Sequence, residues 1–218
     1  RYSLELTKSK SPVVLFIPTA SHDSESYFET VKTYFLGLGA ARVDALYLLS
    51  KPNDSEVKKL IDGADLVYVG GGSTYLLMQE WEKYSLRSKF EERYKENNNF
   101  VLSGLSAGSN CWFEYCTTDS PELTGGSGIA RMKCFGFIKG IGSPHHVSEK
   151  LEREKTLPKA FIALEGKVNR AIAIDDGAAL VHIDDEEFYI NSIEGRKVRV
   201  LNDDNPTQYK VEIEKRDI

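Results

Sequence analysis

The sequence predicts an α/β fold with a mostly parallel β-sheet whose two faces are covered by helices. Strand-length apolar runs alternate with helix-length segments through the first half of the chain. The run at 13–17 is continuously apolar and lies between Pro12 and Pro18, which is typical of a strand buried on both faces of a parallel sheet. Right-handed crossovers then gather the loops that follow the strands at one edge of the sheet, where functional residues are expected.

The predicted helices of the first half begin and end at recognisable signals. Ser24 can cap a helix that runs to about Leu38 and ends at Gly39. Ser73 or Thr74 caps a later helix. The predicted strands are 12–18, 43–49, 66–69 and 100–102, and the predicted helices are 24–38, 55–62, 73–83 and 86–95.

The pattern changes after Trp112. Segment 117–128 is polar and rich in glycine, and a charged helix is predicted from Ser148 to Lys159. Short strands are predicted at 135–138, 171–174, 178–183, 188–190, 198–201 and 209–213, and the later ones suggest an antiparallel edge or tail. Because no repeat or long linker interrupts the chain, we expect a single domain over 1–218.

Composition narrows the classes of function. Hydrophobic residues make up 41% of the 218, enough for a real core, and a net charge of −5 argues against a nucleic-acid-binding surface. The apolar runs are far shorter than a membrane span, and no signal peptide is visible. Since Cys111, Cys116 and Cys134 lack zinc spacing, we expect reduced thiols in a cytoplasmic protein.

Gly104-Leu105-Ser106-Ala107-Gly108 fits G-x-S-x-G, the pattern of a nucleophile elbow. In this geometry a strand turns sharply into a helix and leaves one serine hydroxyl at the tip. Here the strand is 100–102, and the helix is predicted to continue through Trp112 and Phe113. The glycines prevent collisions between the strand and the helix. The simpler interpretation is a plain strand–helix turn, where small residues are common.

A serine is a poor nucleophile until a base removes its proton, and the usual base is a histidine oriented by a carboxylate. His22 lies in an early loop and His182 in a predicted strand. His145 and His146 follow Pro144, which stiffens their loop. We expect one of this pair to be the base, although two solvent-exposed loop histidines also fit the pattern.

Three acidic residues between the serine and the histidine pair could orient the base: Glu114, Asp119 and Glu122. Asp119 lies in a loop beyond the elbow helix and gives the chain order Ser…Asp…His, one workable order among several. Taken alone, an aspartate at such a position is most often a turn residue.

Gly70-Gly71-Gly72 offers unobstructed backbone N–H groups at a predicted helix start. Together with the N–H of Ala107, such groups can stabilise an oxyanion. A phosphate-binding loop is less well supported, because the lysine of the P-loop pattern is missing. A tight turn explains the glycines equally well.

The segments 69–74, 104–110, 117–119 and Pro144-His145 resemble the successive motifs of the peptidase E family. These are serine peptidases typified by aspartyl dipeptidase, with cyanophycinase as a relative. The resemblance runs from about Val13 to Leu180 and implies a three-layer, class I glutamine amidotransferase-like fold. The site that it implies has Ser106 as nucleophile, His145 as base, Asp119 as orienting carboxylate, and an oxyanion hole near Gly71 or Gly72 and at Ala107.

Some features depart from the family pattern. His146 duplicates the histidine, so the choice of His145 rests on the Pro-His pair. The region before Lys10 does not resemble the strand that usually opens the family fold, so the sheet lacks an edge or the sequence is shortened. Aspartyl dipeptidases bind the substrate carboxylate through an arginine. Arg153 is the nearest match and Arg131 a second option, although Arg153 alone resembles an exposed helix residue.

We therefore expect a cytoplasmic serine peptidase that hydrolyses short peptides, such as dipeptides with an N-terminal aspartate, through an acyl-enzyme on Ser106. We expect no metal or organic cofactor. The expected partner is a small peptide substrate, with no nucleic acid and no membrane, and a homodimer is left open. The alternatives are a hydrolase of a related amide, such as a β-aspartyl linkage, and a non-catalytic small-molecule-binding protein on the same fold.

Overall fold

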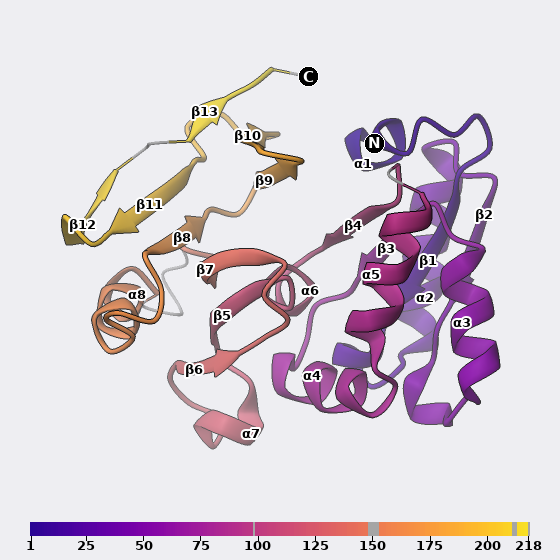
Figure 1. Cartoon of the computed structure of the whole chain (residues 1–218), viewed down its shortest axis with the longest axis horizontal. Helices are drawn as coiled ribbons and strands as arrows, with labels where there is room; N and C mark the ends of the chain where they lie inside the picture. The colour runs from indigo at the N-terminus through magenta and orange to yellow at the C-terminus, as the bar shows by residue number, and fades with distance from the viewer. Residues whose placement is uncertain (98, 148–152, 211–212, 218) are drawn as a thin grey trace. The chain divides into compact units, whose positions relative to one another are not determined.

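The computed structural model describes residues 1–97, 99–147, 153–210 and 213–217. The chain divides into two compact units, Arg1–Ser109 and Asn110–Ile218. The first is coloured indigo to magenta in Figure 1 and the second pink to yellow. The expectation of a single domain over 1–218 stays a prediction.

The first unit contains a four-stranded parallel sheet in the order β2-β1-β3-β4. Its central strand β1 is almost fully buried on both faces, as the continuous apolar run predicted. The strands are β1 (Val13–Ile17), β2 (Arg42–Ala45), β3 (Leu66–Val69) and β4 (Val101–Gly104). This sheet confirms the predicted parallel arrangement.

Helices cover both faces of this sheet. Val31 and Phe35 of α2 (Glu25–Gly37) pack against Val14 and Phe16 of β1. Because the chain moves from β1 to β2 and then back past β1 to β3, right-handed crossovers put α2 and α3 (Asp54–Asp62) on opposite faces. In Figure 1, α3 and α5 (Leu86–Glu96) lie in front of the sheet and α2 behind it.

The helix starts in the first unit follow their predicted caps. Ser24 accepts the N–H of Tyr27, and Ser73 accepts the N–H of Leu76 at the start of α4 (Thr74–Lys83). The predicted strand at 43–49 is shorter, because Leu48–Ser50 forms a 3₁₀ turn, η2. A second turn, η1 (Thr19–Ser21), follows β1. The segment before Lys10 forms a short helix, α1 (Tyr2–Leu6), in agreement with the absence of a strand signal there.

The second unit contains a six-stranded sheet in the order β12-β11-β8-β7-β5-β6 and a smaller sheet in the order β13-β10-β9. In the larger sheet, β7 is parallel to β5 and β8, and the outer strands are antiparallel. The strands are β5 (Phe113–Thr118), β6 (Ala130–Lys133), β7 (Ile138–Ser143), β8 (Arg170–Ile174), β9 (Ala178–Ile183), β10 (Glu186–Asn191), β11 (Val198–Asn202), β12 (Asn205–Lys210) and β13 (Glu214–Lys215). The predicted antiparallel strands near the C-terminus are confirmed, although the one expected at 209–213 is β12, which ends at Lys210, and residues 211–212 lie outside the described part of the chain.

Among the described residues of this unit, two helices occur besides the elbow turn. In α8 (Arg153–Ile162), Leu157 and Phe161 pack against Ile141 and Ala171 of the sheet. A single turn, α7 (Pro121–Thr124), lies in the glycine-rich segment. Of the predicted helix from Ser148 to Lys159, residues 148–152 lie outside the described part of the chain.

Two predicted boundaries in the second unit are wrong. The helix after the elbow is only α6 (Ala107–Asn110), and Phe113 begins β5 instead of extending that helix. The physical reason is tertiary, since the buried Phe113 ring packs among Ile172, Val198 and Val200. The strand expected at 135–138 begins at its last residue, Ile138.

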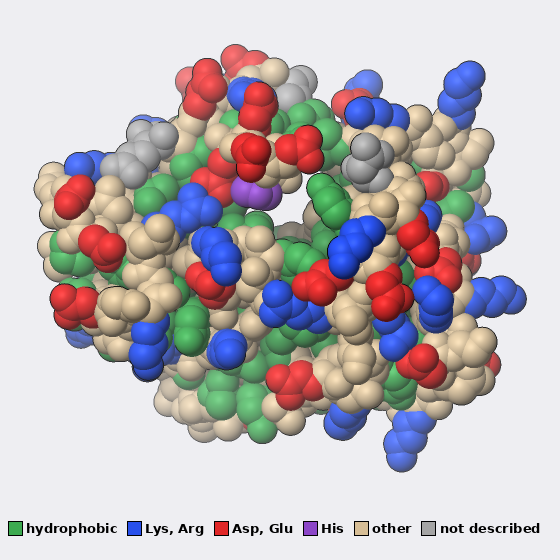
Figure 2. All heavy atoms as spheres, viewed as in Figure 1, with side chains coloured by type: hydrophobic (Ala, Val, Ile, Leu, Met, Phe, Trp, Pro, Cys, Tyr) green, Lys and Arg blue, Asp and Glu red, His purple; other side chains and the backbone are tan. Residues whose placement is uncertain are grey.

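The α/β class predicted from the sequence is confirmed, with parallel pairing at the centre and antiparallel strands toward the C-terminus. Acidic and basic side chains are interspersed on the face shown in Figure 2, in keeping with a net charge of −5. Over the described residues, no helix combines the length and apolar character needed to cross a membrane.

Candidate active site

Ser106 occupies a sharp turn between β4 and α6, with a backbone φ of 57°. Residues other than glycine rarely adopt a positive φ, because their Cβ crowds the backbone. The turn is held on both sides, since Leu105 donates its N–H to Val69 at 3.1 Å and Gly108 donates to Leu105 at 2.9 Å. Ser106 therefore has the strained backbone of a nucleophile elbow.

The two glycines of the motif are required by close backbone contacts. A Cβ on Gly104 would lie 2.1 Å from the Gly108 carbonyl oxygen, and a Cβ on Gly108 would lie 2.1 Å from the Val69 carbonyl oxygen. These distances are far inside van der Waals contact. The steric reason for the glycines is thus the close packing of β4, α6 and β3.

The glycine loop after β3 lies directly against the serine. A Cβ on Gly71 would lie 3.1 Å from the Ser106 Cβ and 3.7 Å from its Oγ. Gly72 has a φ of 134°, and a Cβ there would lie 2.1 Å from the Ala20 carbonyl oxygen. As the first residue of α6, Ala107 has an N–H at a helix start, where no acceptor exists within the helix. The predicted oxyanion-hole residues Gly71 and Ala107 both lie beside Ser106.

His145 is paired with a carboxylate in the second unit. Its Nδ1 lies 2.5 Å from Oδ1 of Asp176, which follows β8 in an exposed turn. His145 has a φ of 55° and is half-buried. A carboxylate on Nδ1 fixes the ring with Nε2 free to accept a proton, which is the arrangement a histidine base needs.

His146 lies in a different environment. Its side chain is 2% exposed, and its Nδ1 has no hydrogen-bond partner among the described residues. The ring packs edge-on against Tyr209 at 4.7 Å between centroids. Burial, with the nearby Arg199 charge, lowers the pKa of His146 to about 4. A buried, neutral ring is a poor candidate for the base, so the geometry favours His145 of the pair.

Asp119, the predicted orienting carboxylate, is bonded to an arginine instead. Its Oδ1 accepts from Nη2 of Arg153 at 3.0 Å. Arg153 Nη1 donates to the Thr117 carbonyl oxygen at 2.9 Å. The expected pairing of Asp119 with His145 is therefore not seen, because His145 is hydrogen-bonded to Asp176. The sequence showed Asp176 only as part of an Asp-Asp-Gly turn, with no signal that linked it to a histidine 31 positions earlier.

Arg153 is not the exposed helix residue suggested by its charged neighbours. Its side chain is 1% exposed, whereas that of Asp119 is 47% exposed. Burial lowers the pKa of Arg153, and the Asp119 charge opposes that shift. With Nη1 and Nη2 already donating to Thr117 and Asp119, the guanidinium forms part of the internal structure of the second unit.

The other residues considered have local roles in the structure. Glu114 accepts from the Gly140 N–H at 2.8 Å and pairs with Lys139. Nδ1 of His182 lies 3.5 Å from Oε1 of Glu187. Arg131 is exposed in β6. In the described part of the chain, no group of three or more His, Cys, Asp or Glu residues is placed to hold a metal ion.

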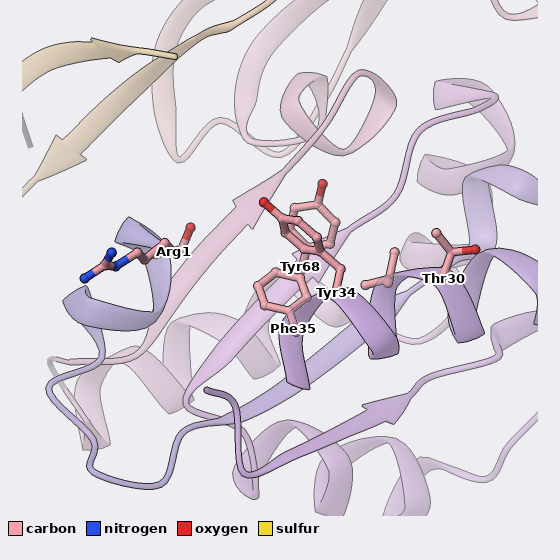
Figure 3. A pocket seen from close by; sticks show the side chains of 7 residues that line it. Arg1, Thr30, Tyr34, Phe35 and Tyr68 are labelled. Atoms are coloured by element: carbon pink, nitrogen blue, oxygen red, sulfur yellow. The ribbon is translucent and has the colours of Figure 1, made fainter. Parts of the chain in front are cut away.

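A pocket of about 310 Å³ lies elsewhere in the first unit (Figure 3). Three aromatic residues line part of it, Tyr34 and Phe35 from α2 and Tyr68 from β3, and the other lining residues are Arg1, Ser3, Thr30 and Val31. Burial raises the pKa of Tyr68 to about 12. Because no predicted site residue is among its lining residues, this pocket is separate from the Ser106 turn.

Comparisons with known proteins show the family of the chain. The model of peptidase family S51 matches residues 2–190. The chain belongs to peptidase family S51. It is 33% identical over 201 residues to the uncharacterized peptidase YgaJ of Bacillus subtilis strain 168, covering 90% of this chain and 81% of YgaJ. As a member of S51, the protein is an enzyme, a peptidase, and the resemblance to the peptidase E family is confirmed.

Two further proteins are similar to this chain. Peptidase E of Haemophilus influenzae strain Rd is 25% identical over 184 residues, covering 80% of this chain and 78% of that protein. The crystal structure of a peptidase from an acI-B1 Actinobacterium matches with a TM-score of 0.65 at 20% identity, covering 98% of this chain and 87% of the other. At that identity the structural match supports the fold of the S51 peptidase and not its substrate.

Proposed function

We propose that this S51 peptidase hydrolyses short peptides through an acyl-enzyme on Ser106. The observation that carries the proposal is the strained turn at Ser106, where φ is 57° and Gly71 packs against the serine side chain. Strained backbone persists only where the surrounding structure enforces it, and it is concentrated at functional sites. In the proposed reaction the Ser106 hydroxyl attacks the scissile carbonyl, the amine leaves, and water hydrolyses the ester.

His145 is the proposed base, and Asp176 is proposed to orient it. Donation of the Nδ1 proton to Asp176 leaves Nε2 as the acceptor for the serine proton, and the carboxylate stabilises the imidazolium that forms. Nε2 then returns the proton to the leaving amine. In this assignment Asp176 takes the role that the sequence suggested for Asp119.

The proposed oxyanion hole combines backbone N–H groups of the glycine loop with the N–H of Ala107. Such donors are most effective where negative charge develops in the transition state. The close approach of Gly71 to Ser106 supports this assignment, because any side chain at 71 would crowd the serine.

The substrate part of the proposal is a dipeptide with an N-terminal aspartate, as the resemblance to aspartyl dipeptidases implies. Arg153 remains the proposed source of positive charge, acting from its buried position with Nη1 and Nη2 already bonded. Its Nε–H has no hydrogen-bond partner among the described residues, so this group is the proposed donor to a substrate carboxylate. We place the activity in the cytoplasm, on the ground that the cysteines are buried thiols.

Hydrolysis of Asp-first and Ala-first dipeptides by the wild type and two serine variants tests the nucleophile. We expect Ser106→Ala to lose about 10⁴-fold or more in kcat/KM, because alanine cannot form the acyl intermediate. Ser109→Ala is the matched control in the same turn and should retain most activity. Full activity in Ser106→Ala would contradict the serine mechanism, and equal turnover of both dipeptides would contradict aspartyl specificity.

A second comparison tests which carboxylate orients the base. We expect Asp176→Asn to lower kcat by about 10³–10⁴-fold, because an amide on Nδ1 favours the wrong tautomer of His145. Asp119→Asn should have a much smaller effect, since its carboxylate is bonded to Arg153. The opposite order of effects would restore Asp119 as the orienting residue.

A further inference from the structure

The glycine loop is held on its other side by a tyrosine that the proposed mechanism does not use. Tyr27 lies in the first turn of α2, and its hydroxyl oxygen accepts the N–H of Gly71 at 3.4 Å. Its ring is so close that a Cβ on Gly70 would lie 2.8 Å from Tyr27 Cε1. The loop therefore lies between Tyr27 on one side and Ser106 on the other.

Packing fixes the position of the Tyr27 ring. It meets Phe16 of β1 edge-on, with 5.0 Å between ring centroids, and Phe16 is fully buried in the sheet. The backbone of Tyr27 is fixed as well, because its N–H donates to the Ser24 cap at the start of α2. A hydroxyl on so constrained a ring has little freedom of position, so it can define the orientation of the peptide that it bonds.

The direction of the Gly71 N–H also bears on the oxyanion hole. A group that donates to Tyr27 points toward α2 and is not free to donate elsewhere at full strength. The orientation of the peptide that carries the Gly71 N–H influences the direction of the next N–H, that of Gly72. Gly72 is in turn fixed by its positive φ and by close contact with the Ala20 carbonyl oxygen.

We propose that Tyr27 is a positioning residue for the reaction, whose hydroxyl holds the Gly71 peptide so that the N–H of Gly72, with that of Ala107, forms the oxyanion hole. This inference rests on the proposed acyl-enzyme on Ser106. Tyr27 acts through the loop and does not touch the substrate. Loss of its hydroxyl lowers the rate of the chemical step and leaves substrate affinity largely unchanged, because only the transition state carries the oxyanion.

The test compares Tyr27→Phe with Tyr34→Phe, a tyrosine on the same helix whose side chain is 62% exposed. We expect Tyr27→Phe to lower kcat by about tenfold or more with KM within about twofold, since small misplacements at a reacting centre are costly. Tyr34→Phe should match the wild type. Thermal unfolding of both variants shows whether they fold. A kcat of Tyr27→Phe within about twofold of the wild type overturns the inference, and so does a loss that lies in KM alone.

A second measurement does not depend on turnover. Hydrogen exchange at the Gly71 amide, followed by NMR, should be faster in Tyr27→Phe than in the wild type and unchanged in Tyr34→Phe, because the acceptor of that N–H has been removed. Unchanged exchange in Tyr27→Phe overturns the inference even if the peptidase is active. If the wild type is inactive but Gly71 exchanges faster in Tyr27→Phe, the proposed function is contradicted while the Tyr27–Gly71 contact is supported. Failure of the proposed function can therefore be distinguished from failure of the Tyr27 inference.

Discussion

At the scale of single residues, the adjacent histidines have opposite environments. His145 is half-buried beside Asp176, and His146 is buried against Tyr209 with its pKa lowered to about 4. The sequence placed both in one loop after a proline, and only the resemblance of the Pro-His pair to the family motif favoured His145. The burial of His146 depends on its distant neighbours, and Tyr209, which packs against the ring, lies 63 residues later in the chain.

The buried His146 predicts an acid-sensitive stability. Because its folded-state pKa of about 4 lies below the ordinary histidine value of 6.5, the unfolded chain takes up the proton first as pH falls. Stability is therefore complete above about pH 6.5 and decreases toward pH 4, by about 3 kcal/mol for this group. His146→Phe keeps an aromatic ring against Tyr209 and removes the titration. The free energy of unfolding, measured with urea between pH 4 and pH 7, should depend less on pH in the variant than in the wild type. An equal pH dependence in both proteins would contradict the buried neutral histidine.

Arg153 and Asp119 should also differ in their effect on stability. Arg153→Met removes buried hydrogen bonds to Thr117 and to Asp119, so we expect a loss of about 1–3 kcal/mol in the free energy of unfolding. Asp119→Asn keeps an acceptor oxygen at a half-exposed position and should cost less than about 1 kcal/mol. Denaturant melts of both variants provide the measurement. A stable Arg153→Met protein would indicate that the guanidinium is not part of the internal structure.

At the scale of elements, the turn between β4 and α6 should not tolerate larger residues. Gly108→Ala places a methyl group 2.1 Å from the Val69 carbonyl oxygen, so we expect a loss of at least about 1–3 kcal/mol in the free energy of unfolding. Gly37→Ala is the matched control, because a Cβ at this position in α2 meets nothing within 4 Å. That change should stabilise by up to about 1 kcal/mol. Equal stability of the two variants would contradict the close packing at the elbow.

The same turn shows what could be predicted at this scale. The glycine spacing around Ser106 is a local steric signal, so the elbow and its strand could be read directly from the sequence. The length of the helix after it could not be predicted, because Phe113 belongs to β5, where it packs in one buried cluster with Ile172 and Val200. Asp176 was missed for a similar reason, since a turn aspartate carries no local sign of its distant partner His145.

At the scale of the whole molecule, the reactivity of the three cysteine thiols measures how well the native fold buries them. All three are buried, and burial raises the pKa of Cys111 and Cys116 well above the ordinary thiol value. Cys116 and Cys134 lie with their sulfurs 3.5 Å apart as thiols. Because the reactive form is the thiolate, a thiol-specific reagent should react slowly with the native protein and with three equivalents after unfolding. Rapid reaction of any thiol in the native protein would contradict this packing.

The central claim is the nucleophilic role of Ser106, and covalent capture by a fluorophosphonate tests it most directly. After incubation, the intact mass should increase by one adduct, and peptide mapping should place that adduct on Ser106. Ser106→Ala should remain unlabelled, and Asp176→Asn should be labelled more slowly than the wild type, because its base is poorly oriented. An adduct on another residue, or absence of any adduct in a folded protein that still hydrolyses dipeptides, would contradict the account.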